Sequence, residues 1–432
     1  MRSRELKRVN RFLKQSFRKR RSWDLCRGVT DPRSRRGRRW KLRALLGAAF
    51  AGMLVRARSL RAVEDLTETA SASGLRAFGV SRRVPDSTLE PVLRQLDPDE
   101  LRSRLHDQVR SLRRGKSLDE QSLPLALVAI DGKCIHTSKQ RVHPACQRQQ
   151  FEGRPPRYLL RVLRAVLVSS PTKVCVDQQV IPAQTNEVGA FPSLWARLRS
   201  AYRTDSLFEA VSLDAGFASE ALCRQIDADG FGYIVGLKEN QPELLAEARG
   251  HFRRTLAPAS GEQARGPESE TDWEPYQGRR MKRQLYRCTE LGGWNGWDHL
   301  RQVWLVRQLT QHADGRQEVE DRFFLTNLRI GRLNGEGVLA VVRAHWGIEN
   351  CANWTMDTQW GEDQRAWCCQ GEALVVLSLL RQLAYNVVQV LFTRHLRAER
   401  YRRYRWEQRF KRIELALSLP PQARERTRRA SG

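Results

Sequence analysis

The chain has 432 residues, and its 76 Lys and Arg outnumber its 48 Asp and Glu to give a formal net charge of +28 at pH 7. Because each phosphate that a basic side chain neutralises releases counterions, this excess favours a polyanionic partner, nucleic acid ahead of an anionic membrane surface. The nine cysteines include no CxxC pair, which argues against a zinc knuckle or a disulfide framework. The apolar run Leu42–Val55 is too short to span a bilayer, and the basic first residues lack a signal-peptide core. We therefore expect a cytoplasmic protein of two or three domains with no membrane partner.

The first part of the chain, residues 1–115, is predicted to be helical. The apolar run just described is typical of a core helix, and apolar residues three apart over 60–66 indicate an amphipathic one. Ser87 and Glu90 have the spacing of a capping box, which predicts a helix over Thr88–Leu96, and Asp97-Pro98 then begins another. Short helices with basic flanks resemble a helix-turn-helix arrangement, although many small helical bundles share this pattern. We predict that this region binds DNA, and that its segment Arg36–Arg114 does so without the catalytic core.

Two apolar strands of the middle region each end on an aspartate. Leu125–Ile130 is followed by Asp131-Gly132, and Leu207–Leu213 is followed by Asp214. A turn is the simpler interpretation of either one alone. Further strand-like runs and helices alternate with them, which predicts an α/β core whose first part covers 116–240. Because ligand sites collect at strand ends in open sheets, the repeated pattern favours a site.

A third carboxylate is expected on a helix within residues 343–367. Helical spacing places four side chains on one face, namely His345, Glu349, Asn353 and Met356. The simpler interpretation of Glu349 is a solvated acid on an amphipathic helix. Three other acids follow it in the sequence: Asp357, Glu362 and Asp363. Asp357 would lie about 80° further round an ideal helix, so we expect it not to share the face of Glu349 closely.

Four motifs in this order, AIDGK, LDAGF, GLKENQPEL and HWGIEN, resemble those of the DDE transposases of bacterial insertion sequences, especially the branch that includes the H-repeat-associated proteins. The resemblance covers residues 31–396 and implies a ribonuclease H-like core. It also implies that Asp131, Asp214 and Glu349 are catalytic and bind two Mg²⁺ ions, for which Mn²⁺ can substitute. Two hard cations held by carboxylates suit phosphodiester cleavage. The expected activity is cutting of DNA at the ends of the element and joining of those ends to target DNA.

The spacing of the acids indicates an insertion. Asp131 and Asp214 are 83 positions apart, whereas Asp214 and Glu349 are 135 positions apart. By resemblance, the surplus is a β-rich insertion over 241–325, with strands in 283–291, 299–309 and 321–328. A C-terminal helical part of the core over 326–398 and a basic tail over 399–432 complete the predicted organisation. Related transposases carry Tyr, Arg and Lys around the Glu, at positions that hold Val342, His345 and Met356 here.

Several side chains are candidates for DNA contact, each with a simpler alternative. Lys133 and Lys238 follow strands and could bind phosphates, although such lysines are usually solvated. His345 could contact DNA, or its polar groups could simply be hydrogen-bonded within the protein. Trp294 and Trp297, among glycines at a predicted hairpin tip, could stack against an extruded base, although Trp is more often core. Aromatic and basic residues alternate in the tail and could follow a DNA backbone.

The predicted partner is double-stranded DNA, at both the element ends and the target, bound by a homodimer or larger assembly in the bacterial nucleoid. Two other functions fit the same residues. A decayed transposase would bind DNA without cutting it, and the three acids count against that alternative. A ribonuclease H-like nuclease or resolvase would cut without strand transfer, and the acids alone do not distinguish it.

Overall fold

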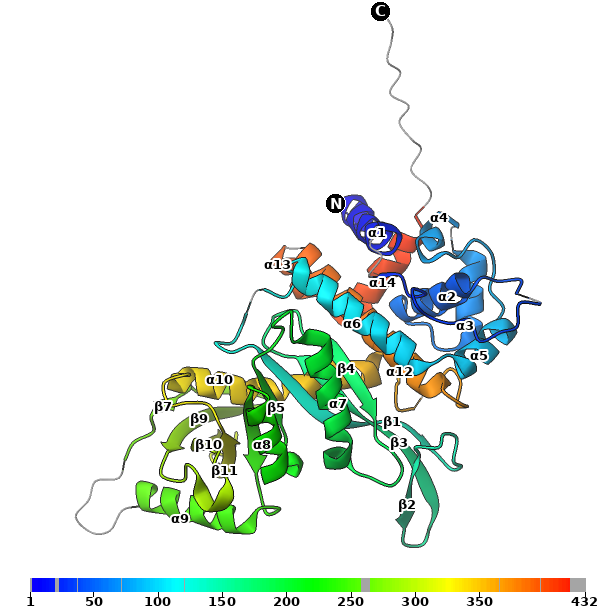
Figure 1. The fold of residues 1–432 in the computed structure, drawn as a ribbon. Coiled ribbons are helices and arrows are strands. Elements are labelled where there is room, and N and C mark those ends of the chain that lie inside the picture. Colours follow the sequence, from blue (N-terminus) through cyan, green and yellow to red (C-terminus); the bar gives the residue numbers. More distant parts are fainter. Residues whose placement is uncertain are drawn as a thin grey trace, which may run out of the picture. The chain divides into compact units, whose positions relative to one another are not determined.

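The computed structural model describes residues 2–19, 23–36, 38–70, 72–119, 121–257, 265–364, 366–396 and 398–419. The chain divides into two compact units (Figure 1). A helical unit contains Met1–Ser111, Ile135–His143 and Thr355–Gly432, and a sheet unit contains Leu112–Cys134 and Pro144–Trp354. The fold is thus mixed α/β with a large sheet and a helical N-terminal region, as predicted.

Helices from both ends of the chain build the helical unit. Its N-terminal helices are α1 (Arg2–Lys19), α2 (Leu42–Leu54), α3 (Leu60–Thr69), α4 (Ala72–Leu75), α5 (Asp86–Gln95) and α6 (Pro98–Arg114). Its C-terminal helices are α11 (Trp354–Trp360), α12 (Ala373–Val390), α13 (Glu399–Arg402) and α14 (Trp406–Leu417). Helix α12 packs against α2 and α5, and α1 packs against α14 (Figure 1). The N-terminal helices therefore share one core with helices about 300 residues later in the chain.

Helix α12 is the hydrophobic centre of this unit. The segment Ala373–His395 is long and apolar enough to cross a membrane by length and composition, but its side chains are buried inside the protein. Gln108 of α6 donates to the Leu383 carbonyl at 3.3 Å, and the Asn386 amide donates to Gln108 at 3.1 Å. The Leu383 carbonyl and the Asn386 amide of α12 thus have protein partners, which is the pattern of a core helix in a folded unit.

The predicted capping box at the start of α5 is wrong. Pro85 is the N-cap residue and makes no side-chain cap hydrogen bond. The Asp86 N–H instead donates to the Glu64 carboxylate of α3 at 3.2 Å, and Arg83 pairs with the same carboxylate. A neighbouring helix therefore satisfies the first donor of α5, and the Ser87 N–H that the capping box assigned to Glu90 donates to the Asp86 carboxylate at 2.6 Å instead.

Eleven strands of the described chain form one sheet. They are β1 (Leu127–Ser138), β2 (Gln147–Phe151), β3 (Arg154–Leu167), β4 (Val174–Val180), β5 (Ala210–Leu213), β6 (Gly232–Leu237), β7 (Ser269–Glu270), β8 (Glu274–Tyr276), β9 (Arg279–Cys288), β10 (Gln302–Gln311) and β11 (Gln317–Thr326). The order is β2-β3-β1-β5-β6-β11-β10-β9-β7, with β4 on β3 and β8 on β9. Strands β1, β5 and β6 are parallel, and β11 continues the sheet antiparallel to β6.

Strand β1 does not end at Asp131, contrary to the prediction. Its parallel pairing with β5 stops at Ile130 opposite Leu213, but the strand continues to Ser138. Side chains beyond the aspartate, such as Ile135, are still buried, so the extended backbone continues to contribute to the core. Asp131 therefore marks the end of the parallel pairing rather than the end of the strand.

Helices of the sheet unit connect and cover these strands. They are α7 (Glu187–Tyr202), the 3₁₀ turn η3 (Ala215–Phe217), α8 (Glu220–Ala228), α9 (Pro242–Leu256) and α10 (Gly335–His345). Strands β9, β10 and β11 occupy the stretches predicted for the insertion. The turn η4 (Trp294–Gly296) lies in the connection from β9 to β10, where the hairpin tip was predicted.

Candidate active site

Asp131 and Asp214 lie at equivalent points of neighbouring parallel strands. The last paired residues are Ile130 of β1 and Leu213 of β5, so each aspartate directly follows the pairing on its own strand. Asp214 is exposed and caps η3, where its carboxylate accepts the Gly216 N–H at 3.1 Å. Parallel register thus brings the two acids to the same edge of the sheet.

Glu349 lies on an irregular helical segment. Helix α10 ends at His345, and Ile348–Asn353 forms a π-helix, η5, before α11 begins. π-helical turns are rare and are frequent at functional sites. The π-helix also means that the ideal-helix angle used to separate Glu349 from Asp357 does not apply here. The expectation that Glu349 sits on a regular helix is therefore wrong, but its side chain is exposed and its charge acts on Asp131.

Asp131 is surrounded by other acids. Burial, and after it the charges of Glu349, Asp214 and Glu187 in that order, together raise the pKa of its carboxyl to about 7, against a lowering effect of the hydrogen bond from the Gly132 backbone. Like charges in electrostatic range disfavour ionisation, and an opposite charge would relieve them. The charges with the largest effect on Asp131 are thus all acids, and a divalent ion bound among them would relieve their repulsion.

Two consecutive hydrogen bonds hold the Asp131 side chain in place. Arg164 of β3, fully buried, donates to the Asn353 side-chain oxygen at 2.9 Å, and the Asn353 amide donates to an Asp131 oxygen at 3.3 Å. Asn353 was expected only to share a face with Glu349. Its position four residues after Glu349 was the one signal in the sequence that could have identified it, whereas Arg164 gave none.

The donor chemistry of this region fits a divalent cation. Asp131, Asp214 and Glu349 offer only carboxylate oxygens, the ligands that Mg²⁺ and Mn²⁺ prefer. In the part of the chain that the structure describes, no three His, Cys, Asp or Glu side chains are arranged to hold a single ion. Asp214 and Glu349 are in electrostatic range of Asp131, but the three acids as placed do not form a ligand set for one ion.

Glu187 is a fourth acid of this region that the sequence analysis did not select. It is the first residue of α7, its carboxylate lies against the backbone of Gly132, and it pairs with Arg161 of β3. Burial raises the pKa of Glu187, Arg161 lowers it, and the charge of Asp214 raises it. In the sequence it looked like an ordinary acid in the first turn of a helix.

The candidate DNA-contacting residues differ in exposure. Lys238 is exposed just after β6, whereas Lys133 is buried. Trp297 is buried with its ring 5.7 Å from that of His299, and Trp294 is half-buried. Of each pair, Lys238 and Trp294 are therefore the ones with accessible surface.

His345 faces the acid-bearing edge of the sheet. Its Nδ1 lies 3.0 Å from the Ser212 hydroxyl on β5. Burial lowers the pKa of His345 to about 4, against a smaller raising effect of the Asp214 charge, so the imidazole is neutral at pH 7. Val342 and Met356, at the other two positions where related transposases carry functional side chains, are buried core residues.

The three acids that were alternatives to Glu349 are partly or fully buried. Glu362 is fully buried, accepts a hydrogen bond from the Ser378 hydroxyl at 2.8 Å and lies 4.0 Å from Arg381. Asp357 and Asp363 are half-buried. None of these three acids is among the main charges that raise the pKa of Asp131. Glu349 is the charge with the largest effect on that pKa.

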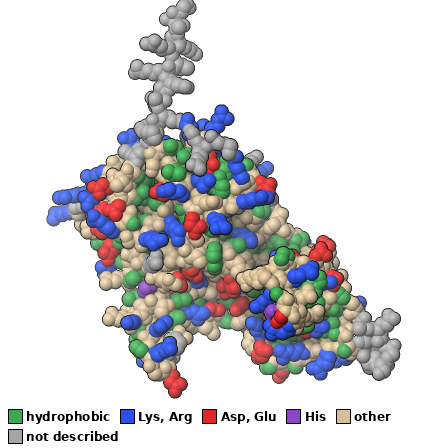
Figure 2. Space-filling model, turned by 180° about the vertical axis from the view of Figure 1, so that it is seen from behind, with side chains coloured by type: hydrophobic (Ala, Val, Ile, Leu, Met, Phe, Trp, Pro, Cys, Tyr) green, Lys and Arg blue, Asp and Glu red, His purple; other side chains and the backbone are tan. Residues whose placement is uncertain are grey.

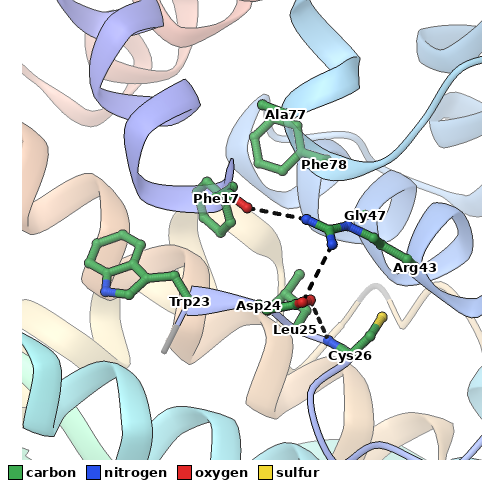
Figure 3. Close-up of a pocket in the computed structure, with 9 residues that line it drawn as sticks. All are labelled: Phe17, Trp23, Asp24, Leu25, Cys26, Arg43, Gly47, Ala77 and Phe78. Atoms are coloured by element: carbon green, nitrogen blue, oxygen red, sulfur yellow. Dashed lines mark hydrogen bonds and ion pairs between the residues drawn. The ribbon is translucent and has the colours of Figure 1, made fainter. Parts of the chain in front are cut away.

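A small pocket in the helical unit is a structural feature rather than a second site (Figure 3). Arg43 on its wall donates to the Phe17 carbonyl at 3.3 Å and pairs with Asp24 at 3.4 Å. The Cys26 N–H donates to Asp24 at 3.2 Å. Burial raises the pKa of the Cys26 thiol to about 12, so it stays protonated and is a poor nucleophile.

Two family models match the chain. The model described as "Transposase DDE domain" matches residues 123–387, and the model described as "DDE_Tnp_1-associated" matches residues 23–108. The first match covers more than half of the 432 residues, and the chain belongs to the DDE transposase family. This confirms the predicted likeness to the transposases of insertion sequences. No curated protein matches the chain at a significant level.

Family membership makes the protein a transposase, an enzyme whose partner is DNA. The family generally uses divalent metal ions.

Proposed function

We propose that this transposase cuts DNA at the ends of its insertion sequence and joins those ends to target DNA, with Asp131, Asp214 and Glu349 as its catalytic acids. The observation that carries the proposal is the raised pKa of Asp131, because it records acids from three separate elements acting on one carboxyl. Strongly perturbed carboxyls of this kind gather at functional sites.

The three acids would hold two Mg²⁺ ions, for which Mn²⁺ can substitute. Bound there, such ions supply activation of the attacking oxygen and stabilisation of the leaving oxygen at the phosphorus. The chain's own contribution is positional. Asn353, itself held by Arg164, orients Asp131, and the cap of η3 orients Asp214. Neutral His345 adds no charge that would compete for the acids.

We infer that the helical unit carries the main contacts to double-stranded DNA, and a basic loop over 33–41 supports this. Asp31 bonds to Arg33 at 2.8 Å and pairs with Arg38 at 3.6 Å, and the Trp40 indole donates to the Arg83 carbonyl at 3.0 Å. Three exposed arginines beside these contacts have no acidic partner among the described residues: Arg35, Arg36 and Arg39. Exposed arginines without acidic partners suit a phosphate backbone.

On the face seen in Figure 2, Lys and Arg side chains are spread widely, with acids between them. The net charge of +28 favours a salt-sensitive contact with phosphates. Under this proposal, three residues remain candidates for DNA contact: Lys238, His345 and Trp294. Lys133 and Trp297 are buried and would first have to become accessible. We expect a homodimer or larger assembly on nucleoid DNA in the cytoplasm, because two element ends must be processed together.

The decisive experiment combines the purified full chain, Mg²⁺ and DNA carrying the flanks of the gene. Nicking at the flanks followed by joining to a second DNA is the expected result. Cutting without joining would favour a nuclease or resolvase, and binding without cutting would favour a decayed transposase. Either outcome contradicts the proposed reaction.

The metal requirement has its own test. Chelator should abolish cleavage, and Mg²⁺ or Mn²⁺ should restore it, because carboxylates without Cys or His ligands select these ions. Calcium should support binding with little chemistry. Restoration by zinc alone would contradict the assigned ligands.

The DNA-binding role is best tested on the full chain. The segment Arg36–Arg114 was expected to bind DNA alone, but its helices α2 and α5 bury their apolar faces against α12. A fragment without α12 would expose that surface and is a poor test of binding.

A further inference from the structure

We propose that Glu187 is a fourth acid of the active site and contributes to divalent-cation binding there, with Arg161 as its counter-charge in the metal-free protein. The inference rests on the proposed function of Asp131, Asp214 and Glu349. It assigns a role to a side chain that lies outside those three acids.

The first argument is contact. A Cβ atom on Gly132 would lie 1.9 Å from Glu187 Oε1 and 2.3 Å from its Cδ, so the carboxylate occupies the space that a side chain at 132 would fill. Gly132 directly follows Asp131, and its lack of a side chain admits Glu187 to the backbone beside the catalytic aspartate. The close approach explains why glycine is needed at this point of β1.

The second argument is how rigidly Glu187 is placed. Asn186 caps α7 by accepting the Gly189 N–H at 3.0 Å, which fixes Glu187 as the first residue of the helix. Helix α7 packs on β3 and β4 and on η3, the turn that Asp214 caps. Glu187 therefore reaches Gly132, the residue after Asp131, from a helix that also contacts the turn beside Asp214.

The third argument is electrostatic. Glu187 acts on the carboxyl of Asp131, and Asp214 acts on Glu187, so its charge belongs to the same group. Its partner Arg161 is a half-buried residue of β3. A structural ion pair could have been placed anywhere on α7, but this one adds a negative charge where the chain already gathers three.

Substitutions of Glu187 and Arg161 are expected to change the affinity for the cation in opposite directions. If Glu187 contributes to cation binding, Glu187→Gln removes attraction and leaves the Arg161 charge to repel the ion, so affinity falls. Arg161→Gln removes a competing positive charge, so affinity stays equal or rises. If the pair serves only to hold α7 on β3, both substitutions lower thermal stability alike and change ion affinity alike.

The test is direct Mn²⁺ titration of the full chain, followed by the electron paramagnetic resonance signal of free Mn²⁺ and without DNA. We expect Glu187→Gln to weaken binding about tenfold, Glu187→Asp to restore part of it, and Arg161→Gln to leave it unchanged or tighter. Circular dichroism melts of each variant identify loss of folding. If Glu187→Gln does not fold, Glu187→Asp and Arg161→Gln still give the predicted order of affinities.

Glu220 provides a matched control. It is also the first residue of a helix, α8, is similarly accessible, and pairs with Arg224 at 2.6 Å. Glu220→Gln should leave Mn²⁺ affinity at the wild-type value. Equal affinities for wild type and Glu187→Gln would overturn the role of Glu187 while leaving the proposed function intact. A wild-type protein that binds no Mn²⁺ and cuts no DNA would overturn both.

Discussion

Two buried acids of the helical unit and Asp131 of the candidate active site have opposite kinds of neighbours. In the helical unit, Glu64 accepts the Asp86 N–H and pairs with Arg83, and Glu362 accepts a hydroxyl and lies near Arg381. The contacts with Asp86 and Arg83 lower the pKa of Glu64 against burial. In the sheet unit, Asp131 has other acids as its charged neighbours, and its pKa is about 7.

The comparison separates two uses of a carboxylate. An acid that is matched by donors and cations inside the protein stabilises the fold and has no capacity left for a ligand. An acid that is crowded by like charges costs stability until a cation arrives. Mutations of the matched acids Glu64 and Glu362 should therefore affect stability, whereas mutations of the acids around Asp131 should affect chemistry.

The largest effect is expected at Glu349. Glu349→Gln keeps the shape but removes the charge, so DNA cleavage should fall about a thousandfold or more, as for groups that act mainly in the transition state. DNA binding and the melting temperature should change little. The assay compares it with Asp357→Asn and Glu362→Gln under the same conditions. Near-normal cutting by Glu349→Gln, with loss in one of the other two, would place the third acid elsewhere.

Glu362 should show the opposite pattern. Glu362→Gln leaves Arg381 without its carboxylate in the core and should lower the free energy of unfolding by about 3 kcal/mol. The measurement is denaturant unfolding. Specific cleavage activity of the folded fraction should stay close to that of the wild type. A cleavage defect without a loss of stability would contradict the assignment of Glu362 as an acid that stabilises the fold.

Asp131 should make the metal-free protein less stable as the pH rises. Its folded pKa of about 7 lies above the usual value near 4, so the folded state holds the proton more tightly, and stability falls as the pH rises from about 4 to about 7. Asp131→Asn should therefore stabilise the metal-free protein at pH 8, by on the order of 2 kcal/mol after allowance for solvent screening.

The same substitution should have little effect at pH 4, where both side chains are neutral. Thermal melts with chelator across pH 4 to 8 measure the difference. Added Mn²⁺ should stabilise the wild type and not the variant. A pH-independent difference between the two proteins would show that Asp131 is not held in a group of interacting acids.

The smallest effect is expected for positive charges. As with the acids, a side chain that is paired inside the protein is compared with one that is not. Arg39 has no acidic partner among the described residues, whereas Arg224 pairs with Glu220. Arg39→Ala should weaken DNA binding severalfold and reduce the slope of log affinity against log salt by about 0.9, the contribution of one phosphate. Arg224→Ala should change neither. Equal effects in a salt titration would argue against the loop over 33–41 as a contact surface.

Local sequence patterns predicted much of the fold. The apolar runs placed α2, β1, β5 and β6 because continuous β-branched and aliphatic segments are stable only when buried. The four motifs that resemble those of the DDE transposases predicted Asp131, Asp214 and Glu349 as a group, and the charges of Asp214 and Glu349 act on Asp131 in the structure. Periodicity is a property of neighbouring residues and can be read from one sequence, whereas the motifs gain their meaning from the family.

Tertiary structure alone decided the contacts between distant segments. The cap of α5 was predicted from Ser87 and Glu90, but Glu64 from another helix provides the contact. Nothing in the sequence indicated that α2 would pack on α12, that Arg164 would reach Asn353, or that Glu187 would fill the space beside Gly132. Each of these contacts depends on which surfaces meet when apolar faces are buried, a choice made by the whole chain rather than by any local pattern.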